Sequence, residues 1–231
     1  MRILYLHQYF QVNSGGTRSY VFSKYLVQSG HQVTMVTGNK IGSKNIDGIC
    51  IKSTKTKYNH NFSFFRRIIS FIHFMIKSTL IGIKEKNIDI IFATSTPLTI
   101  GIPAIIISKL RRKKFIFEVR DVWPDVPIEL GIIKSRLLQK TLFLFEKYIY
   151  KNAAHIIVLS KGMEQNLIKK GVSPKKISVI TNMSMNDYYD SINIDKRKKY
   201  KDKLVCIHPG TMGIVNGLDF ILDVAKQYYD N

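Results

Sequence analysis

The feature of this sequence that most constrains its fold is the regular alternation of short apolar runs with longer helical patterns. Apolar runs of strand length occupy residues 2–9, 32–37, 88–93, 114–119, 155–159 and 177–180. Helical spacing of apolar residues occupies residues 17–29, 61–84, 98–110, 135–150 and 161–170. Nearly continuous apolar runs are typical of parallel strands buried on both faces. The alternation therefore predicts an α/β fold, a Rossmann-like doubly wound parallel sheet with right-handed crossovers.

The alternation stops in a polar stretch that follows residue 182 and ends in the charge run of residues 195–199. We interpret residues 1–189 as a first domain, residues 190–202 as an interdomain linker, and residues 203–231 as a strand and a helix. One strand and one helix cannot build a core alone, because the strand needs neighbours on both sides. We therefore expect the last segment to be the first βα unit of a truncated second domain, whose remainder a separate chain could supply.

Composition narrows the range of partners. The 231-residue chain carries a formal net charge of +20, which predicts attraction to anionic partners such as nucleic acid, a membrane surface or a diphosphate. A general bias of composition toward lysine explains the total charge equally well. No nucleic-acid-binding motif is present, so we expect no nucleic-acid partner. Cys50 and Cys206 form no CxxC pattern and the histidines lack metal-ligand spacing, which predicts reduced thiols in the cytoplasm and no metal site.

Ligands of open parallel sheets bind beyond the carboxyl ends of the strands, and the first loop at such a position spans residues 13–20 (NSGGTRSY). Gly15 and Gly16 allow the backbone to approach a ligand closely, at the start of a helix that favours anions. Arg18 falls in the first helical turn, where a cation opposes the helix dipole. Its position indicates a phosphate or carboxylate partner. The alternative is an ordinary strand–helix turn with a solvated arginine.

Two further loops occupy equivalent positions. Residues 118–127 (EVRDVWPDVP) concentrate Arg120, Asp121 and the single tryptophan of the chain, Trp123, behind an apolar strand. Such density of charged and aromatic side chains is typical of functional loops. The alternative is a charged connection stiffened by proline. Residues 209–213 (PGTMG) connect a strand to a helix, and their backbone amides fit a diphosphate.

The order of these motifs resembles glycosyltransferase family 4, whose members have the GT-B fold of two facing Rossmann-like domains. The resemblance covers essentially the whole chain. It is carried by GGTRSYVFSKYLVQSGHQVTMVTG, FEVRDVWPD, EKYIYKNAAHIIVLSKGM, KKISVITNMSMNDYY and LVCIHPGTMGIVNGLDFILDVAK, which follow one another in the family's order. The sequence is most similar to the branch that makes O-antigen, colanic-acid and capsular polysaccharides.

The resemblance implies transfer of a sugar from a nucleotide-diphosphate sugar, with retention of anomeric configuration and without a metal or other cofactor. It implies that the first domain holds the acceptor and the second domain the donor nucleotide. The site residues that it implies are Gly15, Gly16 and Thr17 near the donor phosphates or the acceptor, Arg18 on an anionic group, Arg120 and Asp121 at the sugar, and Gly210, Thr211, Gly213 and Asn216 at the diphosphate.

Two departures from the family pattern limit this expectation. Many members have an arginine after the glycine of the donor loop and a lysine before the next helix, where this chain has Thr211 or Met212, and Asn216. Fewer cations weaken the electrostatic support of a leaving diphosphate. The family's paired glutamates of the donor domain would lie beyond Asn231. We therefore expect the chain to be catalytically incomplete by itself. The alternative function is that of a non-catalytic carbohydrate- or membrane-binding remnant.

A basic, aromatic helix over residues 61–84 predicts contact with an anionic membrane surface. The residues expected to make that contact are Phe64, Phe65, Arg66 and Arg67, together with the cluster Arg111, Arg112 and Lys113. The resemblance adds a lipid-linked saccharide acceptor and a peripheral location at the inner face of the cytoplasmic membrane. The alternative is a helix that packs one face on the sheet and leaves its cations in solvent. The longest uncharged run, residues 90–108, contains Pro97 and Pro103 and fits a strand, a turn and a helix better than a membrane span.

Overall fold

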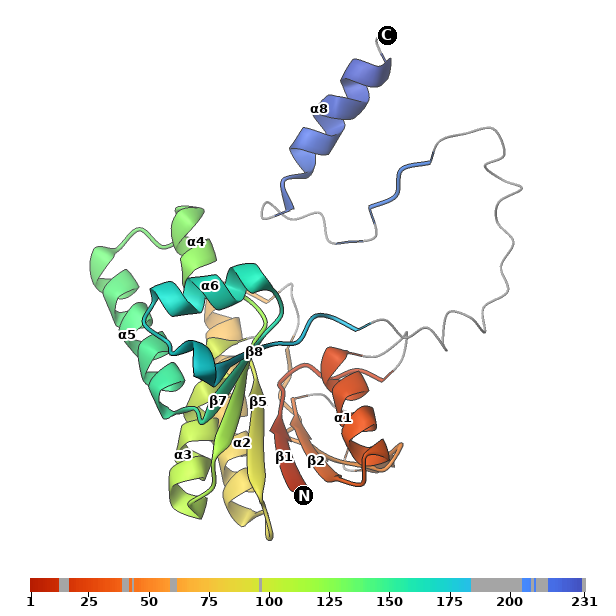
Figure 1. The fold of residues 1–231 in the computed structure, drawn as a ribbon, viewed down its shortest axis with the longest axis vertical. Helices are drawn as coiled ribbons and strands as arrows, with labels where there is room; N and C mark the ends of the chain where they lie inside the picture. The colour runs from red at the N-terminus through yellow and green to blue at the C-terminus, as the bar shows by residue number, and fades with distance from the viewer. Residues whose placement is uncertain are drawn as a thin grey trace. The chain divides into compact units, whose positions relative to one another are not determined.

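The computed structural model describes residues 1–12, 17–38, 42, 44–58, 62–95, 97–183, 205–208, 210 and 216–229. It divides the chain into two compact units, Met1–Met185 and Asn186–Asn231. In the described part of the second unit the regular structure is the helix α8, Leu218–Tyr229. The first unit contains the sheet and the remaining helices (Figure 1).

The first unit is built on an eight-stranded sheet with the order β3-β4-β2-β1-β5-β6-β7-β8. Its strands are β1 Arg2–Leu6, β2 Gln32–Thr37, β3 Lys44–Ile46, β4 Ile49–Ser53, β5 Ile90–Thr94, β6 Phe115–Val119, β7 His155–Val158 and β8 Ile177–Val179. Neighbouring strands are parallel except for the antiparallel pair β3–β4. The α/β fold class with a doubly wound, mostly parallel sheet is therefore confirmed.

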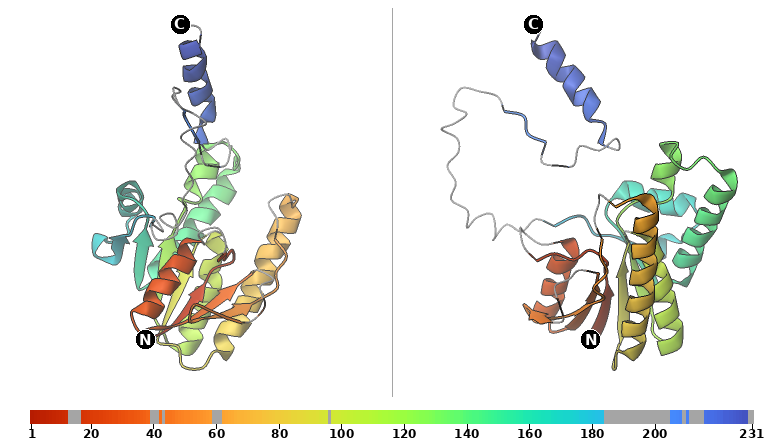
Figure 2. Two further views of the ribbon diagram at one scale, coloured as in Figure 1. Left: turned by 90° about the vertical axis from the view of Figure 1, so that its right-hand side faces the viewer. Right: turned by 180° about the vertical axis from the view of Figure 1, so that it is seen from behind.

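Helices cover both faces of this sheet (Figures 1 and 2). They are α1 Arg18–Gln28, α2 Phe64–Lys84, α3 Gly101–Arg111, α4 Asp125–Glu129, α5 Arg136–Asn152 and α6 Lys161–Lys169, with 3₁₀ turns at Leu98–Ile100 and Pro174–Lys176. The helix α1 packs on one face, and α2, α3 and α5 pack on the other. The strands β2, β4 and β3 lie on one side of β1 in the sheet. The chain then crosses over, and β5 and the later strands lie on the other side of β1. The gap between β1 and β5 is thus the topological switch point of the fold.

The alternation of side chains along β1 explains why both faces need a cover. Leu4 and Leu6 point into the core shared with α2, α3 and α5, whereas Ile3 and Tyr5 point into the core beneath α1. Because successive side chains of a strand point to opposite faces, a nearly continuous apolar run is buried only between two helical layers.

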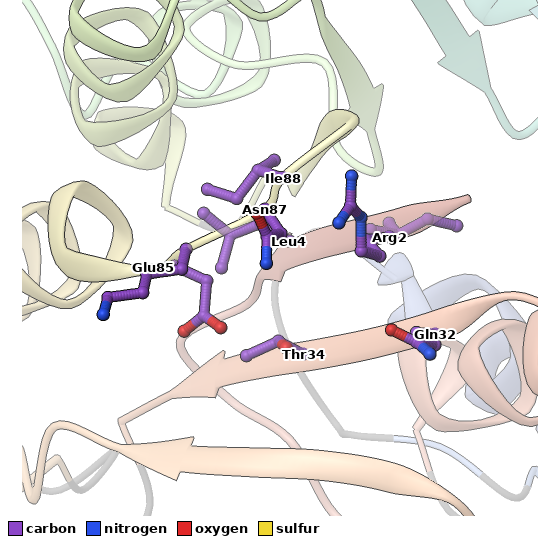
Figure 3. Close-up of a pocket in the computed structure, with 9 residues that line it drawn as sticks. Arg2, Leu4, Gln32, Thr34, Glu85, Asn87 and Ile88 are labelled. Carbon is purple, nitrogen blue, oxygen red and sulfur yellow. The ribbon is translucent and has the colours of Figure 1, made fainter.

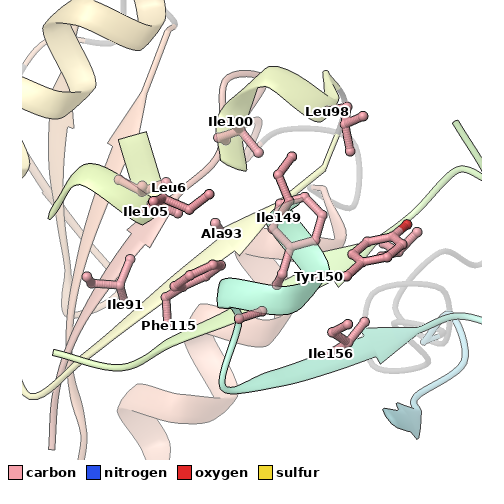
Figure 4. Packing of buried hydrophobic residues seen from close by; sticks show 14 of the residues in the cluster. Leu6, Ile91, Ala93, Leu98, Ile100, Ile105, Phe115, Ile149, Tyr150 and Ile156 are labelled. Atoms are coloured by element: carbon pink, nitrogen blue, oxygen red, sulfur yellow. The ribbon is translucent and has the colours of Figure 1, made fainter. Parts of the chain in front are cut away.

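The larger core holds together β5, β6, β7 and their covering helices (Figure 4). Ile149 of α5 lies so close to α3 that a Cβ at Gly101 would come within 2.5 Å of its Cδ1 atom. The helices α2 and α3 are similarly close, because a Cβ at Gly82 would come within 2.3 Å of Ile107 Cδ1. Glycine at these two positions allows the helices to pack closely on one another.

Most predicted strands and helices of the first unit are confirmed, with ends that differ by a few residues. The antiparallel hairpin β3–β4 was missed. Its turn consists of Asp47 and Gly48, both with positive φ of 48° and 78°, and an Asp-Gly pair is the usual signal of such a turn. Two predictions were wrong. The loop predicted for residues 118–127 ends in the helix α4, which begins at Asp125, and the strand predicted just before residues 209–213 is not formed at the described residues 205–208. No described strand pairs with them, and a strand exists only through such pairing.

Candidate active site

Polar side chains gather at the carboxyl ends of β1, β5 and β6, which lie side by side in the sheet. His7 directly follows β1, Ser95 follows β5, and Arg120 follows β6. The N-terminus of α1 reaches the same edge, because the connection from β1 to α1 begins there. Ligands of doubly wound sheets bind at this edge, next to the switch point. These residues therefore form the candidate site.

A buried ion pair holds the edge together. Arg18 Nε donates to Glu118 Oε1 at 2.8 Å, and the two side chains are 5% and 0% exposed. The other carboxylate oxygen of Glu118 accepts from the Thr94 hydroxyl at 2.8 Å. The remaining nitrogens of Arg18 donate to the backbone carbonyls of Ile180 and Thr181, just after β8. One guanidinium thus connects the start of α1 with the ends of β6 and β8.

The anionic partner of Arg18 lies within the chain. The position of Arg18 in the first turn of α1 predicts such a partner, and the structure supplies one within the chain, Glu118. The carboxylate offsets the unfavourable interaction between the guanidinium and the positive end of the helix dipole. All three side-chain nitrogens of Arg18 have internal acceptors. The contact of Arg18 with a substrate anion, which the resemblance implies, stays a prediction.

A second buried cluster lies beside the ion pair. His7 Nδ1 is 2.6 Å from the Ser19 hydroxyl, which is 2.9 Å from the hydroxyl of Thr17. Burial of the imidazole lowers the pKa of His7 to about 3, with a smaller contribution from the nearby positive charge of Arg120. His7 is therefore neutral near pH 7, so that one ring nitrogen can donate a hydrogen bond and the other can accept one.

Arg120 and Asp121, the residues predicted to act on the sugar, lie at this edge. The backbone N–H of Arg120 donates to Ser95 Oγ at 2.8 Å, and the N–H of Ser95 donates to the Glu118 carbonyl at 2.8 Å. These bonds fix the start of the loop. The Arg120 side chain is half-buried and has no ion-pair partner among the described residues, whereas Asp121 is exposed. Further along the loop, Asp125 pairs with Lys170 instead of facing this site.

The other predicted site residues are described only in part. Gly15, Gly16, Thr211 and Gly213 lie outside the described residues. Gly210 and Asn216 are described within the second unit and cannot be placed relative to the switch point. Their assignment to a donor diphosphate stays a prediction. Within the described ranges, no three His, Cys, Asp or Glu side chains come together as a metal site.

A small pocket of about 140 Å³ lies at the opposite, amino edge of the sheet (Figure 3). Arg2, Gln32 and Thr34 line it from the first residues of β1 and β2, and Glu85 lines it from the end of α2. Arg2 forms an ion pair there with Asp89, with 2.9 Å between Arg2 Nη2 and Asp89 Oδ1. This pocket is at the wrong end of the strands for a ligand of a doubly wound sheet.

The helix α2 carries large apolar side chains on its solvent side. Its core side is formed by the buried residues Phe74, Ser70, Ser78 and Gly82, and the partly buried Ile81 and Ile83 also pack against the core. The side chains that we call the outer face of α2 are exposed: Phe65, Ile68, Ile69, Ile72, Ile76 and Leu80. An ordinary helix on a sheet has the reverse arrangement. Among the described residues, no helix is both long and apolar enough to cross a membrane.

The predicted membrane-contact residues lie at the two ends of α2. Arg66 and Arg67 are exposed in its first turn, and Arg66 lies 4.0 Å from the centre of the Phe62 ring. Arg111 donates from Nη2 to the Glu85 carbonyl at 2.8 Å, which places the end of α3 beside the end of α2. Arg112 and Lys113 are exposed there. Phe65 belongs to the outer face, and the side chain of Phe64 lies outside the described residues.

A family model decides the identity of the fold. The model for glycosyltransferase family 4 matches residues 15–183, well over half of the chain. The chain belongs to glycosyltransferase family 4. No curated protein matches it.

Solved glycosyltransferase structures share the fold of this family 4 chain. HepE from Anabaena, crystallised with UDP-glucose, is 12% identical with a TM-score of 0.50, over 86% of this chain and 49% of HepE. Sucrose-phosphate synthase from Thermosynechococcus elongatus is 16% identical with a TM-score of 0.52, over 78% of this chain and 47% of the synthase. The calicheamicin glycosyltransferase CalG4 is 10% identical with a TM-score of 0.50, over 79% and 52%. The chain spans about half the length of these proteins.

Sequence reasoning missed several polar residues of this family 4 site. His7 lies within the predicted strand of residues 2–9, at the point where the apolar run ILYL gives way to polar residues. Glu118 was counted only as the start of a loop, although a lone carboxylate inside the run KFIFEV requires a buried partner. Ser95 directly follows β5. The available signal in each case was a polar residue at or just beyond the carboxyl end of an apolar run.

Proposed function

We propose that this chain is the acceptor-side part of a retaining glycosyltransferase of the hexosyl or N-acetylhexosaminyl type. It transfers a sugar from a nucleotide-diphosphate sugar to a lipid-linked saccharide during cell-surface polysaccharide synthesis. The observation that carries the proposal is the match of residues 15–183 to glycosyltransferase family 4, a range that includes Arg18, Glu118 and Arg120 of the candidate site. The UDP-glucose bound to HepE supports a nucleotide sugar as the donor.

In this reaction the bond between the anomeric carbon and the diphosphate oxygen breaks, and the acceptor oxygen forms the new bond on the same face. The acceptor proton passes to the leaving phosphate. Negative charge therefore grows on the diphosphate, and cations directed at that charge lower the barrier. Arg120 suits this role because its backbone is fixed by Ser95 while its guanidinium has no ion-pair partner among the described residues. Asp121, exposed beside it, suits a contact with sugar hydroxyl groups.

The test is a transfer assay with UDP-, GDP- and TDP-sugars and a lipid extract as acceptor. The 231-residue chain is assayed by itself and together with a separately produced donor-side domain of a family 4 enzyme. We expect Arg120→Ala to reduce kcat by about 10²–10³-fold in the active form, and Arg136→Ala, a control at an exposed arginine of α5, to leave it unchanged. Absence of transfer with every donor, while sugar or vesicle binding persists, would instead identify a non-catalytic binding protein.

We further propose that the outer face of α2 rests on an anionic membrane, at the inner face of the cytoplasmic membrane. The apolar stripe is flanked on one side by Arg66, Lys77 and Lys84, all exposed. An apolar face with a basic rim is the arrangement of helices that lie in a membrane interface, and each cation near anionic lipid adds roughly 1 kcal/mol. The helix begins at the carboxyl edge of the sheet, because it follows β4. A membrane beneath α2 therefore lies close to the candidate site and to a lipid-linked acceptor.

Co-sedimentation with vesicles of phosphatidylglycerol and phosphatidylcholine tests this contact. We expect binding that weakens as salt rises from about 0.05 to about 0.5 M, because the Debye length then shortens from about 14 to about 4 Å and the cations are screened. The double variant Ile72→Ser/Ile76→Ser is expected to lose binding. Tyr25→Ser is the control, because Tyr25 is at least as exposed as these isoleucines but lies on α1, at the other face of the sheet. Equal binding by both variants would contradict the proposal.

A further inference from the structure

The side chain of Gln8 occupies an unusual position at the switch point. It is 4% exposed, and both its amide nitrogen and its amide oxygen are buried without a hydrogen-bond partner. Among the described residues, Gln8 is the one side chain with two buried polar atoms that lack a partner. Native proteins rarely leave such groups unpaired, because each loses its hydrogen bonds with water on burial. An orphaned amide at this edge of the sheet therefore requires an explanation.

Loose placement does not provide that explanation. The Gln8 carbonyl accepts from the Gly38 N–H at 2.9 Å and from the Thr37 hydroxyl at 3.3 Å. The side chain runs along Gly38, where an added Cβ would come within 3.3 Å of Gln8 Cγ. The backbone is thus fixed between the ends of β1 and β2, and Gly38 leaves room for the side chain. The unpaired amide is held in a defined place.

The surroundings of Gln8 belong to the candidate site. In the parallel pair β1–β5, Leu6 is opposite Ala93, so Gln8 and Ser95 each follow by two residues the paired ends of these neighbouring strands. Ser95 accepts from the N–H of Arg120. The neighbouring His7 is buried and neutral. Neutral groups that both donate and accept therefore lie at the edge that also carries Arg120, whose guanidinium has no ion-pair partner within the described ranges, at the place where doubly wound sheets bind ligands.

We propose that Gln8 binds a sugar of the acceptor saccharide, donating to one ring hydroxyl and accepting from its neighbour. A hydroxyl group both donates and accepts, so a pair of adjacent hydroxyl groups satisfies both ends of one amide. The diphosphate of a nucleotide sugar cannot do so, because it is esterified at both ends and carries no O–H donor for the amide oxygen near pH 7. The assignment rests on the proposed glycosyltransferase function and names a residue that selects its acceptor. It also gives the orphaned amide a role, since its hydrogen bonds form when the sugar binds.

The test uses the substitution Gln8→Met, which keeps the length of the side chain and removes the amide. The free protein loses two unpaired polar groups, so its Tm is expected to rise by roughly 2–4 °C. Binding of methyl glycosides of glucose, galactose, mannose and N-acetylglucosamine, followed by NMR titration of the 231-residue chain, is expected to weaken at least ~10-fold for the glycoside that the wild type binds best. Gln8→Asn, which keeps a shorter amide, is expected to bind with intermediate affinity.

Gln139→Met is the matched control. The Gln139 amide nitrogen donates to the Ile133 carbonyl at 2.7 Å on the surface of α5, so this substitution is expected to lower the Tm and to leave glycoside binding unchanged. A lower Tm with unchanged glycoside binding in Gln8→Met would overturn the inference and leave the proposed function intact. No glycoside binding by the wild type would instead remove the proposed function, and the inference with it. Loss of uridine binding without loss of glycoside binding would assign Gln8 to a nucleoside and overturn the sugar assignment.

Discussion

Two regions of the first unit reverse the usual placement of polar and apolar side chains. At the carboxyl edge of the sheet, Arg18, Glu118 and His7 are buried. On the outer face of α2, large apolar side chains are exposed, while small residues face the core. The two regions therefore have different consequences for stability and for binding. Buried polar groups must be paired to be tolerated, so their removal changes stability. Exposed apolar groups contribute little to folding, so their removal changes binding.

The largest effect is expected from the ion pair. Glu118→Leu leaves the guanidinium of Arg18 buried with two carbonyl acceptors and no counter-ion. We expect a loss of about 3–5 kcal/mol in the free energy of unfolding, because an uncompensated buried charge is costly. Urea unfolding followed by circular dichroism measures it. The double variant Arg18→Met/Glu118→Leu removes both charges and is expected to recover most of that loss. Equal loss of stability in the single and double variants would show that the ion pair does not stabilise this edge of the sheet.

The pH dependence of stability tests the other buried group of this edge. The pKa of His7 is lowered from 6.5 to about 3 in the folded protein, so the unfolded chain binds this proton more readily. The contribution of His7 is complete above pH 6.5 and decreases as the pH falls toward 3. At pH 5 the folded state should have lost about 2 kcal/mol through this residue.

The control for that prediction is His7→Gln, measured over the same pH range. Other groups titrate equally in both proteins, so the difference between the two stability profiles isolates the imidazole. We expect the difference to appear below pH 6.5 and to grow as the pH decreases. Parallel profiles from pH 7 to pH 4 would show that His7 takes up its proton in the folded protein as easily as in the unfolded chain.

The inner face of α2 gives a smaller effect. Gly82→Ala places a Cβ 2.3 Å from Ile107 Cδ1 and 3.1 Å from Leu4 Cδ2, within the core. The strain of overpacking exceeds the gain in helix propensity, and we expect a net loss of about 1 kcal/mol. Gly162→Ala on α6 is the control, because its Cβ would meet only Ser160 Oγ at 3.8 Å. That variant should be slightly more stable than the wild type, and thermal unfolding compares the two.

The two regions also differ in how far the sequence predicts them. The run ILYL and the alternation of strands with helices follow from local periodicity, and so does the existence of α2. The pairing of Arg18 with Glu118 joins residues a hundred positions apart, which no local pattern encodes. The orientation of α2 was left open for a related reason. Gly82 lies on the core side because α3 packs closely on it, and that contact depends on the order of the strands.

The smallest effect on stability is expected from the outer face of α2. Ile76 is 56% exposed there, so Ile76→Ser removes little buried apolar surface. We expect a change within about 0.5 kcal/mol in the free energy of unfolding, as for other surface substitutions. Phe74→Ser, on the buried side of the same helix, is the matched comparison and should cost several kcal/mol. A large loss in Ile76→Ser would show that this face is covered by another part of the protein, because only buried apolar surface contributes to stability on that scale. Unchanged stability combined with lost vesicle binding is the result that assigns the outer face of α2 to a partner outside the fold.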